Sequence, residues 1–168
     1  LSNARKLTNV EIHSTELYNI NVENNIYLRN IDLSGCSALG TVTATGSSLN
    51  LSNCKYLKYV DVRGTALTEV QLNSDGGSLT EIYYPTTIQS IQLINQRLLE
   101  VLGLPYVNGV AESLYTVSIE NCPRIYKLND SSDESVYSSF KGMAYVNNLT
   151  LKNCLDIITT MNYTGFSN

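Results

Sequence analysis

The segment LSNCKYLKYVDV, residues 51–62, recurs along the chain, because four other segments align with it without gaps. They are LSNARKLTNVEI from Leu1, LSGCSALGTVTA from Leu33, IENCPRIYKLND from Ile119 and LKNCLDIITTMN from Leu151. The shared frame is LxNCxxLxxV. A frame that returns several times in one chain is typical of a repeat architecture, in which each unit packs only against its neighbours.

Apolar residues inside the repeats alternate with polar ones, as in Val60 and Val62 or Ile91 and Leu93. This period of two places alternate side chains on one face, as a β-strand requires. Each repeat of about 19 to 22 residues holds a second apolar LxxVxL segment, which indicates extended structure on two faces. Such short units bury their Leu rows only by stacking about 4.8 Å apart with parallel pairing.

The frame resembles the leucine-rich repeat family, especially its cysteine-containing LxxLxLxxC variety, over roughly residues 1–128 and 146–160. The resemblance implies a mainly β, right-handed solenoid of short parallel strands. It also implies that the Asn, Cys or Thr of each repeat turns inward and satisfies backbone groups of the adjacent loop. Direct alignment places seven residues in this structural ladder: Cys36, Cys54, Cys122, Cys154, Thr15, Thr65 and Thr87.

Residues 129–148 interrupt the repeat, and we interpret them as an insertion within one solenoid that spans residues 1–168. Ser132 as N-cap, two acidic residues after it and Gly142 as a stop predict a short helix there. Leu1 falls at a core position of the frame, and no capping unit is evident at either end. We therefore expect a fragment of a longer protein, with open solenoid ends that allow self-association.

Composition limits the classes of partner. The formal charge is −4, from 11 Lys and Arg against 15 Asp and Glu. Nucleic-acid binding is therefore not expected, because it needs a positive field that neutralises phosphates. Membrane insertion is not expected either, since no apolar run approaches the roughly 18 residues of a spanning helix.

The four cysteines do not predict a metal site. They are separated by 18, 68 and 32 residues, without a CxxC pair, and the chain has one His. His13 follows Ile12 at a position where the frame predicts exposure, and no motif identifies a triad or a nucleophile elbow. We therefore expect no cofactor, no metal and no enzymatic activity.

Tyrosine is the main hint of binding, with twelve Tyr against two Phe and no Trp. Rings with a polar tip are favoured at interfaces. Tyrosine also suits a strand surface, and that alternative stays open. The frame predicts that five tyrosines are candidate partner-binding residues: Tyr18, Tyr59, Tyr83, Tyr115 and Tyr126.

Two functional hypotheses follow from the repeat and its uncharged, polar surface. The first is a non-catalytic recognition or adhesion module with a Tyr/Asn/Ser/Thr-rich surface for a protein or glycan partner. The second is a structural spacer or assembly element of a larger surface protein or virion. The resemblance to repeats of bacterial surface and phage virion proteins favours a cell-surface, extracellular or virion location.

Overall fold

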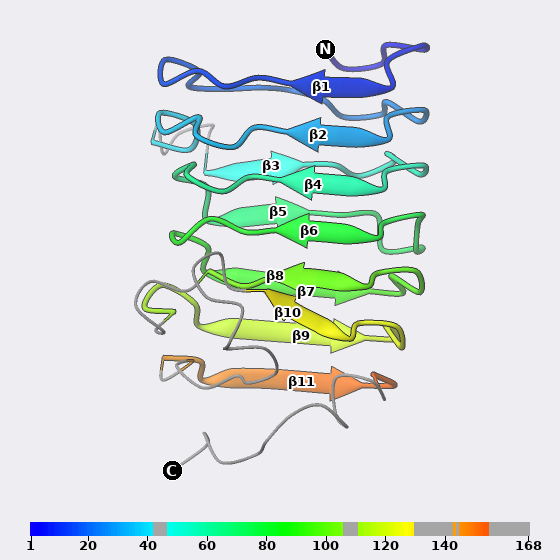
Figure 1. Cartoon of the computed structure of the whole chain (residues 1–168), viewed down its shortest axis with the longest axis vertical. Helices are drawn as coiled ribbons and strands as arrows, with labels where there is room; N and C mark the ends of the chain where they lie inside the picture. The colour runs from blue at the N-terminus through cyan, green and yellow to red at the C-terminus, as the bar shows by residue number, and fades with distance from the viewer. Residues whose placement is uncertain (42–46, 106–110, 130–142, 144, 155–168) are drawn as a thin grey trace.

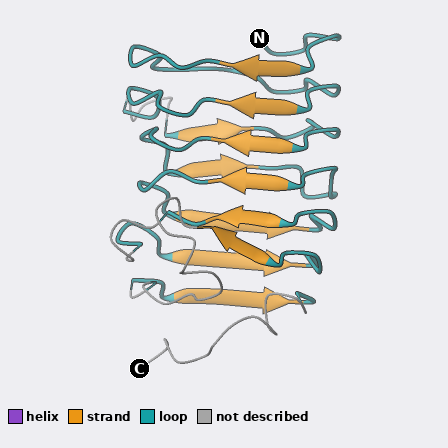
Figure 2. Cartoon of the chain, viewed as in Figure 1, coloured by secondary structure: helices purple, strands orange, loops and turns teal. Residues whose placement is uncertain are grey.

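The computed structural model describes residues 1–41, 47–105, 111–129, 143 and 145–154. Within these residues it contains eleven short β-strands and no helix (Figure 2). Six strands form one sheet, which we call the front sheet; in spatial order they are β1 (Asn9–Glu11), β2 (Asn30–Asp32), β4 (Tyr59–Asp61), β6 (Glu81–Tyr83), β8 (Val101–Gly103) and β10 (Lys127–Asn129). Five back strands form two sheets, β3 (Ser48–Asn50) with β5 (Glu69–Gln71), and β7 (Ser90–Ile94), β9 (Thr116–Glu120) and β11 (Asn148–Lys152).

All of the strand pairs are parallel. Apart from β1 with β2, each pair joins a strand to the next but one in the chain, and the back strands divide between β5 and β7, which are not paired with each other. The chain therefore passes alternately through the front sheet and the back strands, which point in opposite directions in Figure 1. The registers place equivalent residues side by side, for example Ile31 beside Val60 and Val60 beside Ile82. The prediction of a mainly β structure with short parallel strands is confirmed.

One hydrophobic core is shared by the front and back strands. The middle residue of each front strand is buried, and the back strands contribute side chains to the same cluster. Fully burying one Leu, Ile or Val contributes about 1.5–3 kcal/mol. A single repeat has no neighbour against which to bury these side chains, so stacking supplies that stabilisation. The front strands contribute Val10, Ile31, Val60, Ile82, Leu102 and Leu128, and the back strands contribute Leu49, Val70, Ile91, Val117 and Leu93.

Asparagine turns the chain at the ends of the back segments. Every non-glycine residue found with positive φ in the described part of the chain is an Asn, at φ between 52° and 62°. Asn tolerates this left-handed conformation better than most residues. These residues are Asn3, Asn24, Asn53, Asn95, Asn121 and Asn153. After front strands β2 and β4 the corresponding place is taken by Gly35 and Gly64, at φ 77° and 72°.

Several predictions at the chain's ends and insertion have different outcomes. Leu1, expected in the core, is 62% exposed. The predicted insertion separates β10 from β11, and its helix between Ser132 and Gly142 lies outside the described residues. In the residues that are described, no helix could cross a membrane.

Candidate functional site

The seven aligned ladder residues fall into two columns rather than one. Cys36, Thr65 and Thr87 follow front strands β2, β4 and β6, whereas the other three cysteines follow back strands β3, β9 and β11. The interpretation of a single ladder is therefore corrected. The residues that follow front strands form a front column, and those that follow back strands form a back column. The frame repeats on both sides of each unit, so sequence alignment alone superimposed the two columns.

The cysteine side chains of both columns are buried free thiols that donate to backbone carbonyls. Cys36 Sγ donates to Ile12 O at 3.1 Å, and Cys154 Sγ to Ile119 O at 3.2 Å, each in the preceding repeat. Burial raises the pKa of Cys122 to about 11. A thiol that stays protonated is a poor nucleophile and metal ligand, so the Cys122 thiol is suited to a structural role as a hydrogen-bond donor.

The threonines of the front column differ from one another. Thr65 Oγ1 donates to Val62 O at 2.8 Å, and Thr87 Oγ1 donates to Leu67 O at 2.7 Å. Thr15 was predicted to turn inward like the others, and this prediction is wrong because Thr15 is exposed. It follows β1, and no front strand precedes β1 in the described chain to cover it.

Two amide side chains complete the back column, and the alignment of cysteines missed both. Asn25 and Gln96 are 0% and 3% exposed. Asn25 Nδ2 donates to Leu1 O at 2.9 Å, and Gln96 Nε2 donates to Asn73 O at 2.8 Å. Each directly follows a positive-φ Asn, just as Cys54 follows Asn53, and this step in the frame was the signal that could have located them.

The positive-φ asparagines also bond to one another from repeat to repeat. Asn53 Nδ2 donates to Asn24 Oδ1 at 2.9 Å. Further along, Asn121 Nδ2 donates to Asn95 Oδ1 at 2.9 Å, and Asn153 Nδ2 donates to Asn121 Oδ1 at 2.7 Å. The corner is thus held by both backbone conformation and side-chain amides, and it fixes the position of the turns that follow it.

Two of the predicted tyrosines lie together on the front sheet, where their polar groups are already engaged. The Tyr59 and Tyr83 rings have centroids 5.9 Å apart. Tyr59 Oη donates to Asp61 Oδ2 at 3.2 Å, and the Arg63 guanidinium lies 4.6 Å from the centre of the Tyr83 ring. Burial and then the Asp61 charge raise the pKa of Tyr59 to about 12. These half-buried rings therefore already make contacts within the front sheet, and a partner would meet them in that engaged state.

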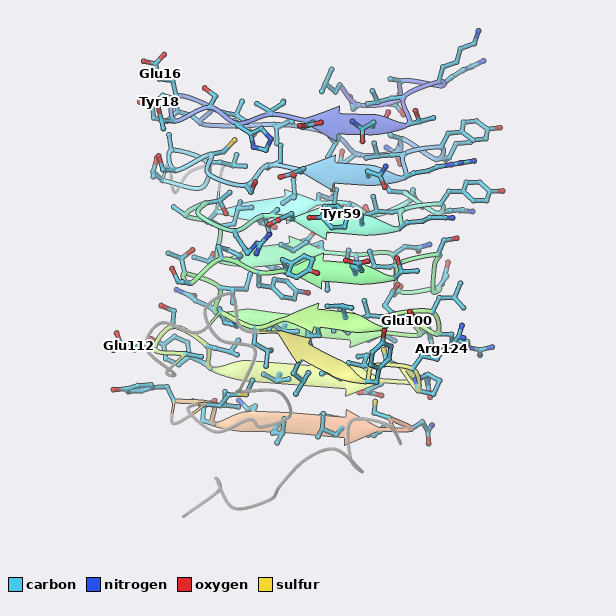
Figure 3. The ribbon with its side chains drawn as sticks, in the orientation of Figure 1. Glu16, Tyr18, Tyr59, Glu100, Glu112 and Arg124 are labelled. Carbon is cyan, nitrogen blue, oxygen red and sulfur yellow. The ribbon has the colours of Figure 1, made fainter. Side chains whose placement is uncertain are left out.

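The other three predicted tyrosines are exposed but separated. Tyr18 follows β1 on the edge where the chain leaves the front sheet, and Tyr115 lies on the same edge before β9, four repeats away. Tyr126 precedes β10 on the opposite edge. Figure 3 shows Tyr18 at one edge, Glu100 and Arg124 at the other, and Tyr59 on the front sheet between them. The five candidates consequently do not form one continuous surface.

The edge opposite Tyr18 carries an aromatic and cationic surface that the sequence analysis missed. We call the four residues before each front strand the basic edge; it comprises residues 5–8, 26–29, 55–58, 77–80, 97–100 and 123–126. It holds seven of the eleven Lys and Arg residues of the chain and a single carboxylate, Glu100. These segments have a formal charge of +6, against −10 for the rest of the chain and −4 in total. The cations are Arg5, Lys6, Arg29, Lys55, Lys58, Arg97 and Arg124.

Tyr27 and Tyr56 lie at equivalent places in neighbouring turns of the basic edge. Their rings are stacked, with centroids 6.0 Å apart and planes 1° from parallel, and they are 49% and 53% exposed. Together with Arg5, Lys6, Thr8 and Arg29 they line a hollow of about 400 Å³. The sequence contains a pattern that places these two rings at equivalent positions, because Asn25-Ile-Tyr27-Leu28 aligns with Cys54-Lys-Tyr56-Leu57.

A histidine, a serine and a carboxylate meet at the front sheet without forming a catalytic triad. His13 Nδ1 lies 2.9 Å from Ser34 O and 3.4 Å from Ser34 Oγ, and His13 Nε2 lies 3.4 Å from Glu11 Oε1. The hydrogen bond to the Ser34 carbonyl raises the pKa of His13. A ring nitrogen that donates to that carbonyl cannot accept the serine proton. No cluster of three or more His, Cys, Asp or Glu fit for a metal ion is found in the described residues.

No protein-family model, no curated protein and no solved structure matches the chain.

Proposed function

We propose that the chain is a right-handed, leucine-rich-repeat-type solenoid that acts as a non-catalytic recognition or adhesion module for a protein or glycan. The observation that supports this function most is the stacking of equivalent residues in register. Parallel pairing repeats outward-facing side chains at intervals of about 4.8 Å, and such rows suit an extended partner. The exposed rings of Tyr18, Tyr115 and Tyr126 add apolar contact area with a polar tip.

A glycan microarray together with a set of purified cell-surface proteins tests the recognition proposal. The test variant carries Tyr18→Ser, Tyr115→Ser and Tyr126→Ser. A matched control carries exposed substitutions without aromatic loss, Glu16→Gln, Ser37→Ala and Glu112→Gln. We expect the wild type and the control to retain the same ligands and the Tyr variant to lose at least some of them. Absence of any ligand for all three proteins contradicts the recognition role.

A structural or assembly role is a second candidate, and one observation favours it. Strand β1 is the first of the front sheet, and its outer edge has no partner strand in the part of the chain that is described. An unpaired strand edge can template pairing with another chain. Under this hypothesis the protein self-associates with rising concentration, and Asn9→Pro, which removes an N–H from the outer edge of β1, reduces that association. Analytical ultracentrifugation of both proteins over a concentration series distinguishes the two roles.

A further inference from the structure

We propose that the basic edge is a binding site for an acidic saccharide, centred on Tyr27, Tyr56, Arg5, Lys6 and Arg29. The inference rests on the proposed recognition function and names both the surface and the ligand class. It starts from the hollow of about 400 Å³ that these residues line with Thr8. That volume falls within the usual range for small-ligand sites, about 300–1,000 Å³.

The cations of this site are free to bind a ligand. Arg5, Lys6 and Arg29 make no side-chain hydrogen bond or ion pair with any residue that the structure describes. The contrast lies within the same chain: Arg63 is paired with Asp61, and Lys152 Nζ lies 3.4 Å from Glu120 Oε2. Carboxylates bind guanidinium groups through short, charge-assisted and often bidentate hydrogen bonds. Unpaired arginines beside a hollow therefore favour a ligand that carries carboxylates.

The tyrosines explain why a sugar suits the site. A sugar ring presents a face of C–H groups that packs on an aromatic ring, while its hydroxyls bond to polar tips such as Tyr Oη. Tyr27 and Tyr56 give two such rings on neighbouring repeats, each about half exposed. Beyond them the cations recur along the edge at Lys55, Lys58 and Arg97. A chain of acidic sugars lying along the edge would meet a new cation at nearly every repeat.

Geometry and charge disfavour a nucleic acid at the same place. A base inserted between the two rings needs about 7 Å, twice the contact distance of about 3.5 Å between carbon atoms. The ring centroids are 6.0 Å apart, so the rings as they are placed leave no room for a base between them. The rest of the chain also has a formal charge of −10, which disfavours a densely charged phosphate backbone. A uronic-acid chain has one carboxylate per sugar and a less concentrated charge.

Isothermal titration calorimetry with tetragalacturonate at low and physiological salt tests the site. Its methyl-esterified form keeps the sugar rings and loses the charges; a twelve-nucleotide oligo-dT and polyglutamate represent the other anion classes. We expect tetragalacturonate to bind, with at least tenfold weaker binding after esterification and weaker binding as salt rises. Equal or tighter binding of oligo-dT or polyglutamate overturns the assignment to a saccharide, as does equal binding of the ester.

Variants locate the site. Arg29→Gln and Tyr56→Ala are each expected to weaken tetragalacturonate binding at least tenfold. Lys152→Gln is the matched control, because it removes one positive charge from a back strand, away from the basic edge. Equal effects of Arg29→Gln and Lys152→Gln contradict the site, and circular dichroism confirms that the surface variants are folded. If tetragalacturonate does not bind while the protein still retains ligands on the microarray, the present inference is overturned and the recognition function stands.

Discussion

Each positive-φ asparagine has both a conformational and a hydrogen-bonding role, and Asn121 allows the two to be separated. Its φ is 56°, and its amide bonds to both Asn95 and Asn153. We expect Asn121→Ala to cost about 2–3 kcal/mol, from about 1–2 for the left-handed backbone and about 1 for lost hydrogen bonds. Asn121→Gly keeps the conformation accessible, so it should cost about 1 kcal/mol less. Urea unfolding measures both, and equal losses for Ala and Gly would exclude a role for the conformation.

Gly103 gives a second test at the scale of single residues. It lies beside Tyr83 in the pairing of β8 with β6. A Cβ atom on Gly103 would lie in severe clash with Tyr83 Cδ1 and 2.9 Å from Tyr83 Cα. The ring and the Cα atom of Tyr83 together occupy the space that a side chain would need.

We expect Gly103→Ala to destabilise the protein by about 1–3 kcal/mol, the usual cost of overpacking. In a Tyr83→Ala background the ring is absent, and the same Gly103→Ala change should cost less. A double-mutant cycle by chemical denaturation measures the coupling. Strict additivity of the two changes would show that the ring does not impose the glycine.

At the scale of strands, the sequence predicts the buried positions correctly where a single physical rule decides them. Alternation of apolar residues located Ile31, Val60 and Ile91 in buried strand positions, because a pleated strand has a strict period of two. The same frame precedes turns on both sides of a repeat, so alignment could not assign Cys36 and Cys54 to different columns. That separation depends on which strands pair, and pairing is a long-range property.

The candidate site was less predictable than the strands. The frame is defined by its apolar and cysteine positions, so it does not identify polar residues at the same step, such as Gln96. Exposure predicted from the frame does not distinguish the ring of Tyr59, which is engaged within the sheet, from the exposed ring of Tyr27 on the basic edge. Neighbouring turns bring Tyr27 and Tyr56 together across 29 residues of sequence, and only the alignment of turns could have revealed the pair.

The buried thiol of Cys122, which follows β9 in the chain, predicts a loss of stability at alkaline pH. Burial raises the pKa of Cys122 from 9.0 to about 11 in the folded protein. A raised folded-state pKa gives a contribution that is fully present below pH 9 and is lost as the pH rises through about 11. We expect urea midpoints to fall between pH 9 and 11, and to fall less in Cys122→Ala. Parallel pH profiles for the two proteins would contradict this contribution.

At the scale of the whole molecule, the fold separates charge as well as polarity. Winding through alternating strands collects the turns before the front strands along one edge, and those turns hold most of the cations. Those turns contain one carboxylate, Glu100, and the other carboxylates of the described residues lie outside them. A chain with a net charge of −4 can thus present a local positive surface, which the total charge conceals. Both the columns and the basic edge depend on the same strand pairing.

The pairing itself is tested most directly by backbone nuclear Overhauser effects in a uniformly labelled sample. The structure predicts contacts typical of parallel strands between Asn30 and Tyr59 and between Ser48 and Glu69, together with ring contacts between Tyr27 and Tyr56. Strand β3 should show no backbone contacts of an antiparallel pair with β4, although the two are consecutive in the chain. Antiparallel contacts between β3 and β4, in place of the β2–β4 contacts, would contradict the alternating fold and with it the basic edge.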